Sequence, residues 1–504
     1  MTHEHAVTVG TSGLTLAEVV AVSRGDETVV ISENALTAMS VARAQIEALA
    51  ASPEPVYGVS TGFGALATRH IALEDRRQLQ RSLIRSHAAG MGAPVEREVV
   101  RALMLLRLKT LTSGRTGVRP VVAETMAALL NAGITPVVHE FGSLGCSGDL
   151  APLSHCALVL MGEGRATGSD GVERPVPELL AEAGIEPIEL QEKEGLALIN
   201  GTDGMLGMLI LALADLEHLC DVADLTAAMS VEGLMGTDQV YRAELHLPLR
   251  PHPGQAVSAA NMFRSLAGSQ IIASHKEDDD RVQDAYSLRC APQVTGAVRD
   301  TIAHARTVAE RELRATIDNP VVLDDGTVSS NGNFHGAPVG YVLDFLAIAA
   351  ADLGSMSERR TDRMLDKNRS HGLPPFLADD PGVDSGLMIA QYTQAGLVSE
   401  NKRLAVPASV DSIPSSAMQE DHVSMGWHAA RKLRLVVDNL TRILAIELVA
   451  AARAIELRAP LQPSPASAEV IALLRESVPG PGPDRFLAPE LAAAEMLVTR
   501  LRLS

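Results

Sequence analysis

The stretch of sequence that decides the fold is Val423–Leu457, which reads VSMGWHAARKLRLVVDNLTRILAIELVAAARAIEL. Its apolar residues recur at steps of three and four, as one face of an α-helix requires: Leu433, Val436, Val437, Leu440, Leu444 and Leu448. At about 1.5 Å per residue, this pattern predicts a helix on the order of 50 Å long. Helices of this length pack in bundles, often between subunits, so we expect an all-α chain built as an elongated helical bundle.

A second stretch repeats the helical spacing, with apolar side chains at Val342, Phe345, Leu346, Ala349, Leu353 and Met356. Composition agrees with helices, because Ala and Leu are abundant and alternating runs of β-branched residues are few. With 504 residues, of which 46% are hydrophobic and 21% charged, the chain is long and apolar enough to bury a large core. These values exclude a disordered or fibrous protein.

Charge and cysteine content restrict the partners and the compartment. The chain has 43 Lys and Arg against 62 Asp and Glu, a net charge of −19, which argues against nucleic acid or anionic lipid as a partner. Uncharged runs such as Gly204–Ala214 are shorter than the roughly 18 to 20 apolar residues that span a bilayer, and the start, MTHEHAVTVG, lacks the features of a secretory signal. Four cysteines without a CxxC pair indicate neither a disulfide framework nor a metal site. We therefore expect a cytoplasmic protein that binds no membrane.

Glycine-rich, polar segments interrupt the helical patterns at residues 57–64, 142–155, 200–204, 283–293, 329–336 and 419–422. Segments of this kind place functional side chains on loops between rigid helices. The motif-rich part gives way to long helical patterns near residue 210. We predict a loop-rich N-terminal domain over residues 1–210, and a long-helix bundle with a C-terminal helical region over residues 211–504.

The segment from Gly142 reads GSLGCSGDLAPLSH and has several interpretations. It is not a P-loop, because no Lys follows the glycines, and it is not a serine nucleophile elbow, because position 149 is Asp rather than Gly. Cys146 as a nucleophile is weakly supported, since the chain has 15 His that could serve as a distant partner. A purely structural alternative is a tight turn into a helix, with Asp149 as the cap and Pro152 in the first turn.

The order Cys146-Ser147-Gly148 indicates a covalent chemistry of the backbone. A glycine after serine leaves an amide nitrogen free to attack the carbonyl carbon of residue 146, and loss of water then closes a five-membered ring. Ser147 can lose its hydroxyl to leave an alkene. Residue 146 contributes only its carbonyl, so its side chain does not enter the ring.

This segment resembles, over its whole length, the GSxGxSGDLAPLxH signature of the aromatic amino acid ammonia-lyase family. The resemblance implies a carbon–nitrogen lyase in which Cys146, Ser147 and Gly148 form 4-methylideneimidazol-5-one (MIO), an electrophile that replaces any dissociable cofactor. Cys146 stands where the family has Ala, and His139 stands where relatives often have Pro. The resemblance is collinear from the N-terminal region to about residue 457.

Other segments match the family and imply further site residues. YGVSTGFG implies Tyr57 as the base that removes a β-proton of the substrate, with Ser60 replacing the family's Asn. EGLALINGT implies Asn200 as a hydrogen-bonding support for the MIO carbonyl or the substrate, with Asp203 where Gln is common.

The segment VQDAYSLRCAPQ implies Gln283, Tyr286 and Arg289 as site residues, with Arg289 binding the substrate carboxylate. A guanidinium fork suits that task, because it grips a carboxylate through two parallel hydrogen bonds. NGNFHG implies Phe334 packing against the substrate ring or the MIO group. The family shares its sites among subunits, which implies a homotetramer.

Two further segments bear on the substrate. RSHAAGMG contains Ser86 and His87, and QEDHVSM contains Gln419 and Glu420. The resemblance implies that these positions contact the substrate ring and select it. A buried carboxylate and histidine need polar partners, which an imidazole supplies and a phenyl ring does not. We therefore predict L-histidine as the substrate, converted to trans-urocanate and ammonia, the first step of histidine degradation.

Three alternatives remain beside that prediction. A tyrosine or phenylalanine lyase, or an aminomutase, would use the same scaffold. A helical assembly protein with a dead site fits the long helices but not the retention of Cys146-Ser147-Gly148, Tyr57, Tyr286 and Arg289 together. A pyridoxal phosphate enzyme needs a Schiff-base Lys, which the matched motifs do not supply.

Overall fold

The computed structural model describes residues 6–51, 61, 71–277, 279 and 281–502. The chain divides into two compact units, each assembled from three segments. Unit 1 contains Met1–Leu211, Arg306–Leu343 and Pro407–Arg431, and unit 2 contains Ala212–Ala305, Asp344–Val406 and Lys432–Ser504. The predicted domain division at residue 210 stays a prediction. Unit 1 also contains two segments from later in the chain, Arg306–Leu343 and Pro407–Arg431.

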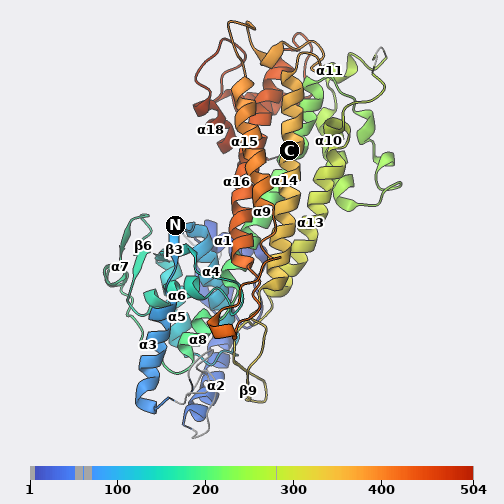
Figure 1. Ribbon diagram of the computed structural model, residues 1–504. Coiled ribbons are helices and arrows are strands. Elements are labelled where there is room, and N and C mark those ends of the chain that lie inside the picture. The colour runs from blue at the N-terminus through green and yellow to red at the C-terminus, as the bar shows by residue number, and fades with distance from the viewer. Residues whose placement is uncertain (1–5, 52–60, 62–70, 278, 280, 503–504) are drawn as a thin grey trace. The chain divides into compact units, whose positions relative to one another are not determined.

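Long helices dominate the described residues, so the chain is mostly helical. The predicted all-α chain holds only in part, because these residues also include nine short strands. Four of them run through both units: α9 (Asp203–Gly233), α13 (Ala291–Glu312), α14 (Ala337–Leu365) and α16 (Gly426–Glu456). The stretch Val423–Leu457 that predicted a long helix forms α16, and the second stretch lies in α14 (Figure 1).

Unit 1 contains the shorter helices α1 (Leu16–Arg24), α2 (Glu33–Ala50), α3 (Arg76–His87), α4 (Arg97–Leu111), α5 (Pro120–Asn131), α6 (Leu150–Leu160), α7 (Val176–Ala183) and α8 (Glu194–Ile199). Helix α4 is the centre of its core, because every residue from Val99 to Leu111 is buried. Pro at the first helical position starts α5, where its missing N–H costs nothing.

Short strands also belong to unit 1, in four small sheets. Their bounds are β1 (Val7–Val9), β2 (Val29–Ile31), β3 (Met91–Pro94), β4 (Thr135–Pro136), β5 (His139–Phe141), β6 (Arg165–Thr167), β7 (Glu173–Pro175), β8 (Val321–Val322) and β9 (Val328–Ser329). Strands β1 and β2 are parallel, whereas β3 with β5, β4 with β6, β6 with β7 and β8 with β9 are antiparallel. The β3 and β5 pair fixes the chain just before the Gly142 segment.

Unit 2 adds α10 (Pro253–Leu266), α11 (Gln270–Ala273), α12 (Tyr286–Arg289), α15 (Met388–Leu404), α17 (Pro465–Arg475) and α18 (Ala488–Val498) to its parts of the long helices. Single turns of 3-10 helix complete the chain at Leu73–Asp75, Gln239–Tyr241, Ala243–Leu245, Pro375–Leu377 and Ser416–Met418.

A buried polar cluster holds the long helices of unit 2 side by side (Figure 1). The Glu447 carboxylate on α16 accepts hydrogen bonds from Ser357 on α14 at 2.6 Å and Ser230 on α9 at 2.7 Å, and it pairs with Arg360 at 2.5 Å. The carboxylate and guanidinium are both buried, so each compensates the charge of the other. Gln394 of α15 joins the group by donating to the Ile443 carbonyl at 2.9 Å.

Two helical stretches, Glu194–Gly233 and Ala337–Leu365, are long and apolar enough to cross a membrane by length and composition alone. Their most apolar windows are 100% and 61% buried inside the protein, as in the core helices of a globular protein. The count of unbroken uncharged runs missed them, because it stops at each charged residue. Among the described residues, no group of three or more His, Cys, Asp or Glu side chains could hold a metal ion.

Candidate active site

The tripeptide Cys146-Ser147-Gly148 lies in unit 1, in the loop between β5 and α6. Gly148 has φ of +102°, and a Cβ atom placed there would lie 2.3 Å from the Gly201 nitrogen and 2.4 Å from the Gly201 oxygen. Only glycine fits this position, because any side chain would meet backbone that cannot move aside. A bare amide nitrogen after Ser147 is what ring closure onto the Cys146 carbonyl requires. The tripeptide therefore fits an MIO precursor.

Asp149 anchors the residue that follows the tripeptide. Its N–H donates to the Gly201 carbonyl at 2.7 Å, and its carboxylate accepts from the Ser143 hydroxyl at 2.8 Å and from the N–H groups of Gly204 at 2.8 Å and Met205 at 3.1 Å. Burial raises the pKa of Asp149 to about 7, and these donors oppose the rise. Asp149 is the N-cap residue of α6, as the structural interpretation predicts, but its carboxylate makes no capping hydrogen bond there and accepts from N–H groups in the first turn of α9 instead.

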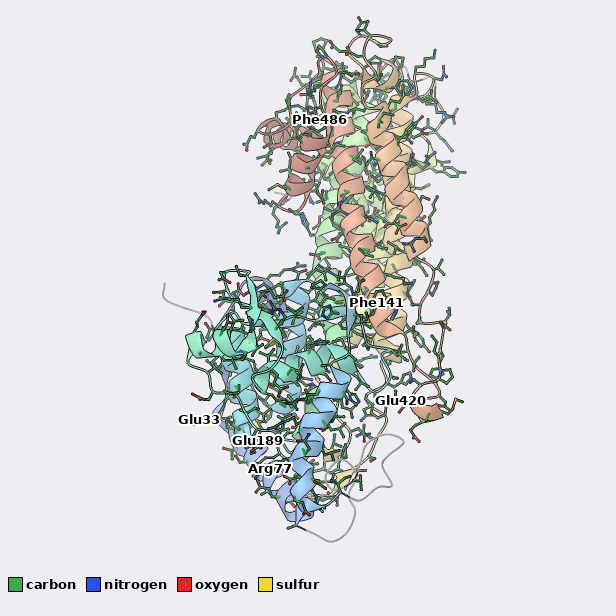
Figure 2. The ribbon with its side chains drawn as sticks, turned by 60° about the vertical axis from the view of Figure 1, so that its left-hand side comes forward. Glu33, Arg77, Phe141, Glu189, Glu420 and Phe486 are labelled. Atoms are coloured by element: carbon green, nitrogen blue, oxygen red, sulfur yellow. The ribbon has the colours of Figure 1, made fainter. Side chains whose placement is uncertain are left out.

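Glu420 lies against the tripeptide. The Ser147 hydroxyl donates to Glu420 Oε1 at 2.8 Å, and the Cys146 thiol donates to Oε2 at 3.1 Å. Figure 2 shows Glu420 on the segment that precedes α16, where backbone hydrogen bonds between Ser415 and Glu420 in both directions, at 2.9 and 3.2 Å, close the loop. Burial and the Glu420 carboxylate raise the pKa of the Cys146 thiol to about 12. Cys146 is therefore not a thiolate nucleophile at neutral pH.

Ser86 and His87 end helix α3 of the same unit. The Ser86 hydroxyl lies 3.0 Å from His87 Nδ1 and donates to the Leu83 carbonyl at 3.1 Å. Burial lowers the pKa of His87, and a hydrogen bond with the Leu83 backbone and the Glu420 charge oppose this fall without cancelling it. The ring-binding role of His87 with Glu420 stays a prediction. Gln419 is exposed.

Asn200 and Phe334 lie on two loops of unit 1 that contact the tripeptide's surroundings. The Asn200 amide donates to the Asn319 carbonyl at 3.0 Å, and its Oδ1 is buried with no hydrogen-bond partner among the described residues. Phe334 is half-buried, two residues before Gly336, whose N–H donates to the Gly145 carbonyl at 3.0 Å. The structure therefore gathers Cys146, Ser147, Gly148, Asn200, Phe334 and Glu420 in one unit.

Gln283, Tyr286 and Arg289 lie in unit 2, on the short helix α12 and the segment just before it. The guanidinium carbon of Arg289 lies 4.7 Å from the centroid of the Tyr286 ring, a cation–π contact on one turn of α12. Tyr286 is 70% exposed, and Arg289 Nε is buried with no hydrogen-bond partner in the described part of the chain. Gln283 lines a cavity of about 150 Å³. Tyr57 lies outside the described residues.

Two histidines beside the site were missed by the sequence analysis. The rings of His335 and His422 are stacked with centroids 5.3 Å apart, and His422 Nδ1 lies 3.2 Å from His335 Nε2. They flank Phe334 and Glu420 closely in sequence. The motif NGNFHG contains His335 and the motif QEDH contains His422. Placing the two motifs in one site would have suggested that these histidines are in contact.

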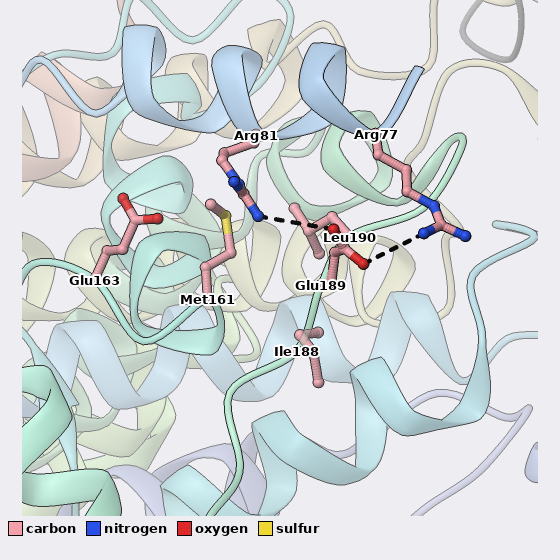
Figure 3. Close-up of a pocket in the computed structure, with 7 residues that line it drawn as sticks. All are labelled: Arg77, Arg81, Met161, Glu163, Ile188, Glu189 and Leu190. Carbon is pink, nitrogen blue, oxygen red and sulfur yellow. Dashed lines mark hydrogen bonds and ion pairs between the residues drawn. The ribbon is translucent and has the colours of Figure 1, made fainter. Parts of the chain in front are cut away.

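Another pocket of unit 1, of about 30 Å³, contains none of the predicted site residues (Figure 3). Arg77 and Arg81 of α3 pair across it with Glu189, at 3.5 and 3.8 Å. Its charges are balanced and its volume suits about one water molecule, so it offers no room for a substrate.

Comparison with known proteins shows the family of this chain. The family model described as aromatic amino acid lyase matches residues 14–476. The chain belongs to that family, and the prediction of a carbon–nitrogen lyase is confirmed.

Individual relatives and solved structures show which members of the family the chain resembles. The chain is 73% identical to histidine ammonia-lyase of Streptomyces avermitilis over 98% of this chain and 96% of that one. It is 72% identical to histidine ammonia-lyase of Streptomyces griseus over 99% and 98%. Among solved structures, tyrosine aminomutase of Streptomyces globisporus superposes with a TM-score of 0.93 at 38% identity, over 98% and 97%. Histidine ammonia-lyase of Trypanosoma cruzi gives 0.90 at 37%, over 98% and 94%.

Proposed function

We propose that this chain deaminates L-histidine to trans-urocanate and ammonia, the first step of histidine degradation. The observation that carries the proposal is the Glu420 carboxylate, 2.8 Å from the Ser147 hydroxyl, with its charge acting on His87. Glu420 offers an acceptor beside the tripeptide and His87 offers an imidazole in the same unit, which suits a ring that both donates and accepts hydrogen bonds. The relatives at more than 70% identity carry the same activity in their names.

The electrophile would be MIO, formed from Cys146, Ser147 and Gly148. When formed, it supplies an electrophilic carbon that draws electrons from the substrate amine. The fit rests on the bare nitrogen of Gly148 and on the close packing of Gly148 against Gly201. Asn200 has a buried, unsatisfied oxygen among the described residues, and its amide can support a polar group nearby.

The other predicted residues would divide the remaining tasks. Glu420 and His87 hold the imidazole, and Arg289 binds the substrate carboxylate through its planar fork. Gln283, Tyr286 and Gln419 line the substrate, Ser86 orients His87, and Phe334 packs on the ring. Tyr57 removes the β-proton. A base must lie within about 3 Å of that proton, so the substrate has to be held at both ends.

We propose a homotetramer with shared sites, in the cytoplasm. Apolar side chains lie exposed on unit 2, including Phe345 and Ile348 on α14 and Ile389 and Tyr392 on α15. Exposed apolar groups on neighbouring turns of long helices favour burial against another subunit. The four cysteines are free, which suits a reducing compartment.

An aromatic lyase or aminomutase acting on tyrosine or phenylalanine is the alternative, since tyrosine aminomutase has the same fold. A partly buried carboxylate facing a phenyl ring would lose hydrogen bonds to water without replacement. The test measures ultraviolet absorbance of the conjugated product from histidine, tyrosine and phenylalanine, and identifies any β-amino acid by chromatography. Histidine should be strongly preferred. Preference for tyrosine or phenylalanine, or release of a β-amino acid, would overturn the substrate assignment.

A further inference from the structure

Arg107 is a fully buried cation of α4 that binds the loop behind the tripeptide. Its Nη1 donates to the carbonyls of Ala197 at 2.8 Å and Asn200 at 3.2 Å, and its Nη2 donates to the Ile317 carbonyl at 3.1 Å. Nη2 also lies 2.7 Å from the Asp203 carboxylate, in an ion pair that is almost completely buried. One guanidinium therefore fixes both ends of the Asn200–Asp203 loop.

The loop is compressed between Arg107 and the tripeptide. A Cβ atom on Gly201 would lie 1.8 Å from Arg107 Nη2, and a Cβ atom on Gly148 would lie 2.3 Å from the Gly201 nitrogen. The guanidinium, Gly201 and Gly148 are thus in direct succession with no space between them. The Asp149 N–H, which donates to the Gly201 carbonyl at 2.7 Å, locks the far side of the same contact.

Asp203 keeps the guanidinium in this orientation. Its carboxylate faces two cations, Arg107 and Lys109, both of which oppose the rise in its pKa that burial causes. Lys109 in turn donates to the Glu312 carbonyl at 3.5 Å and to the Ala315 carbonyl. Removing either partner of the Arg107–Asp203 pair would take the nearest compensating charge from a buried group.

We propose that Arg107, held by Asp203, is a positioning residue for ring closure in Cys146-Ser147-Gly148. The inference rests on the proposed function. In that step the Gly148 nitrogen bonds to the Cys146 carbonyl carbon, whose oxygen leaves as water with the N–H hydrogens of Gly148 and Ser147. A second water takes the Ser147 hydroxyl and α-hydrogen and leaves the alkene. Arg107 touches none of these atoms; it holds Gly201 against Gly148, so that the backbone stays bent for the attack.

Arg101 supplies a matched control, because it is a second buried arginine of the same helix. Its guanidinium donates to the carbonyls of Val22 at 2.9 Å and Leu130 at 3.0 Å and pairs with Asp26 at 3.1 Å. Arg101→Lys therefore imposes a similar loss of buried hydrogen bonds, at a place that does not touch the Asn200–Asp203 loop.

The experiment follows the intact mass of full-length chains made by cell-free synthesis over time, together with thermal midpoint and oligomeric state. The unmodified chain and Arg101→Lys should lose two water masses at the same rate. Arg107→Lys should fold but lose them roughly tenfold more slowly or incompletely, as expected when a hydrogen bond to a charged group is removed. A tryptic peptide containing Gly148 locates the loss.

Each result decides a separate point. Arg107→Lys losing both waters at the rate of the unmodified chain overturns the positioning role, and so does an equal delay in Arg101→Lys. If Arg107→Lys fails to fold, Asp203→Asn carries the same test, since it keeps the size of the side chain and removes the charge that holds Arg107. Folded Asp203→Asn losing both waters at the unmodified rate likewise overturns the proposal. An unmodified chain that keeps its full mass contradicts the proposed function itself.

Discussion

The two clusters of predicted site residues differ in how far their polar groups are satisfied. In unit 1, Asp149 is fully buried and accepts three hydrogen bonds, and the Ser147 hydroxyl donates to Glu420. In unit 2, Tyr286 is 70% exposed and Arg289 Nε is buried without a partner among the described residues. Around the tripeptide the described fold satisfies Asp149 and Ser147 but leaves Asn200 Oδ1 without a partner, and in unit 2 it leaves Arg289 Nε without one. We therefore expect both of these groups to meet a ligand or another subunit.

Ser147→Ala should have the largest effect of the substitutions considered, because it removes MIO formation from the tripeptide of unit 1. It removes the hydroxyl that must leave, while the surrounding hydrogen bonds of Asp149 remain. The variant should fold and assemble normally, show no double loss of water and lose nearly all activity. Intact mass, light scattering and product absorbance check these outcomes, and full activity in this variant would end the MIO proposal.

Glu420→Ala should give the next largest effect. Histidine turnover should fall by roughly 10² to 10³, the loss typical when a group that stabilises the transition state is removed. Tyrosine and phenylalanine should remain poor substrates and lose nothing further, because they do not use the carboxylate. The mass loss should be complete, since Gly148 and not Glu420 sets the bend of the backbone. Unchanged histidine turnover would refute the role of Glu420 in substrate binding.

Arg289→Lys tests the residues of unit 2, where Arg289 Nε is buried without a hydrogen-bond partner among the described residues. The ammonium of Lys cannot reproduce the planar guanidinium fork. The free energy of transition-state binding, measured from kcat/KM, should therefore fall by about 2 to 3 kcal/mol, as for the loss of a charge-assisted hydrogen bond. The thermal midpoint should change little, because Arg289 Nε has no partner to lose in the described chain. Kinetics and midpoint falling together would instead make Arg289 a structural residue.

The pH dependence of His87 should give the smallest effect. Burial lowers the pKa of His87, so between its folded value and the unfolded value of about 6.5 the unfolded chain binds the extra proton. The free energy of unfolding should therefore fall as the pH drops below about 6.5, and His87→Gln should reduce that dependence. Thermal midpoints of both proteins across this pH range check it; identical slopes would show that His87 does not contribute.

The candidate site residues that the sequence indicates are those in short motifs. Cys146, Ser147, Gly148 and Asp149 are contiguous and form one recognisable motif, and Glu420 lies in the motif QEDH. The long helices could also be predicted, because α16 follows a clear spacing of three and four.

The supporting contacts could not be predicted in the same way, because they join distant parts of the chain. Arg107 donates to the Ile317 carbonyl, and the Asp149 carboxylate accepts from N–H groups of α9 although Asp149 is the N-cap residue of α6. One sequence signal was available. Arg101, Arg107 and Lys109 interrupt an apolar stretch of α4 on more than one face, and charges so placed in a core helix indicate buried partners. The identity of those partners required the fold.

The most direct test of the central claim is the intact mass of the purified, unmodified chain, with the loss located by peptide mapping. We predict a mass lower than the sequence mass by two waters, confined to the peptide that contains Cys146, Ser147 and Gly148. A chain that deaminates histidine at its full sequence mass would contradict the account, because the tripeptide would then not be the electrophile.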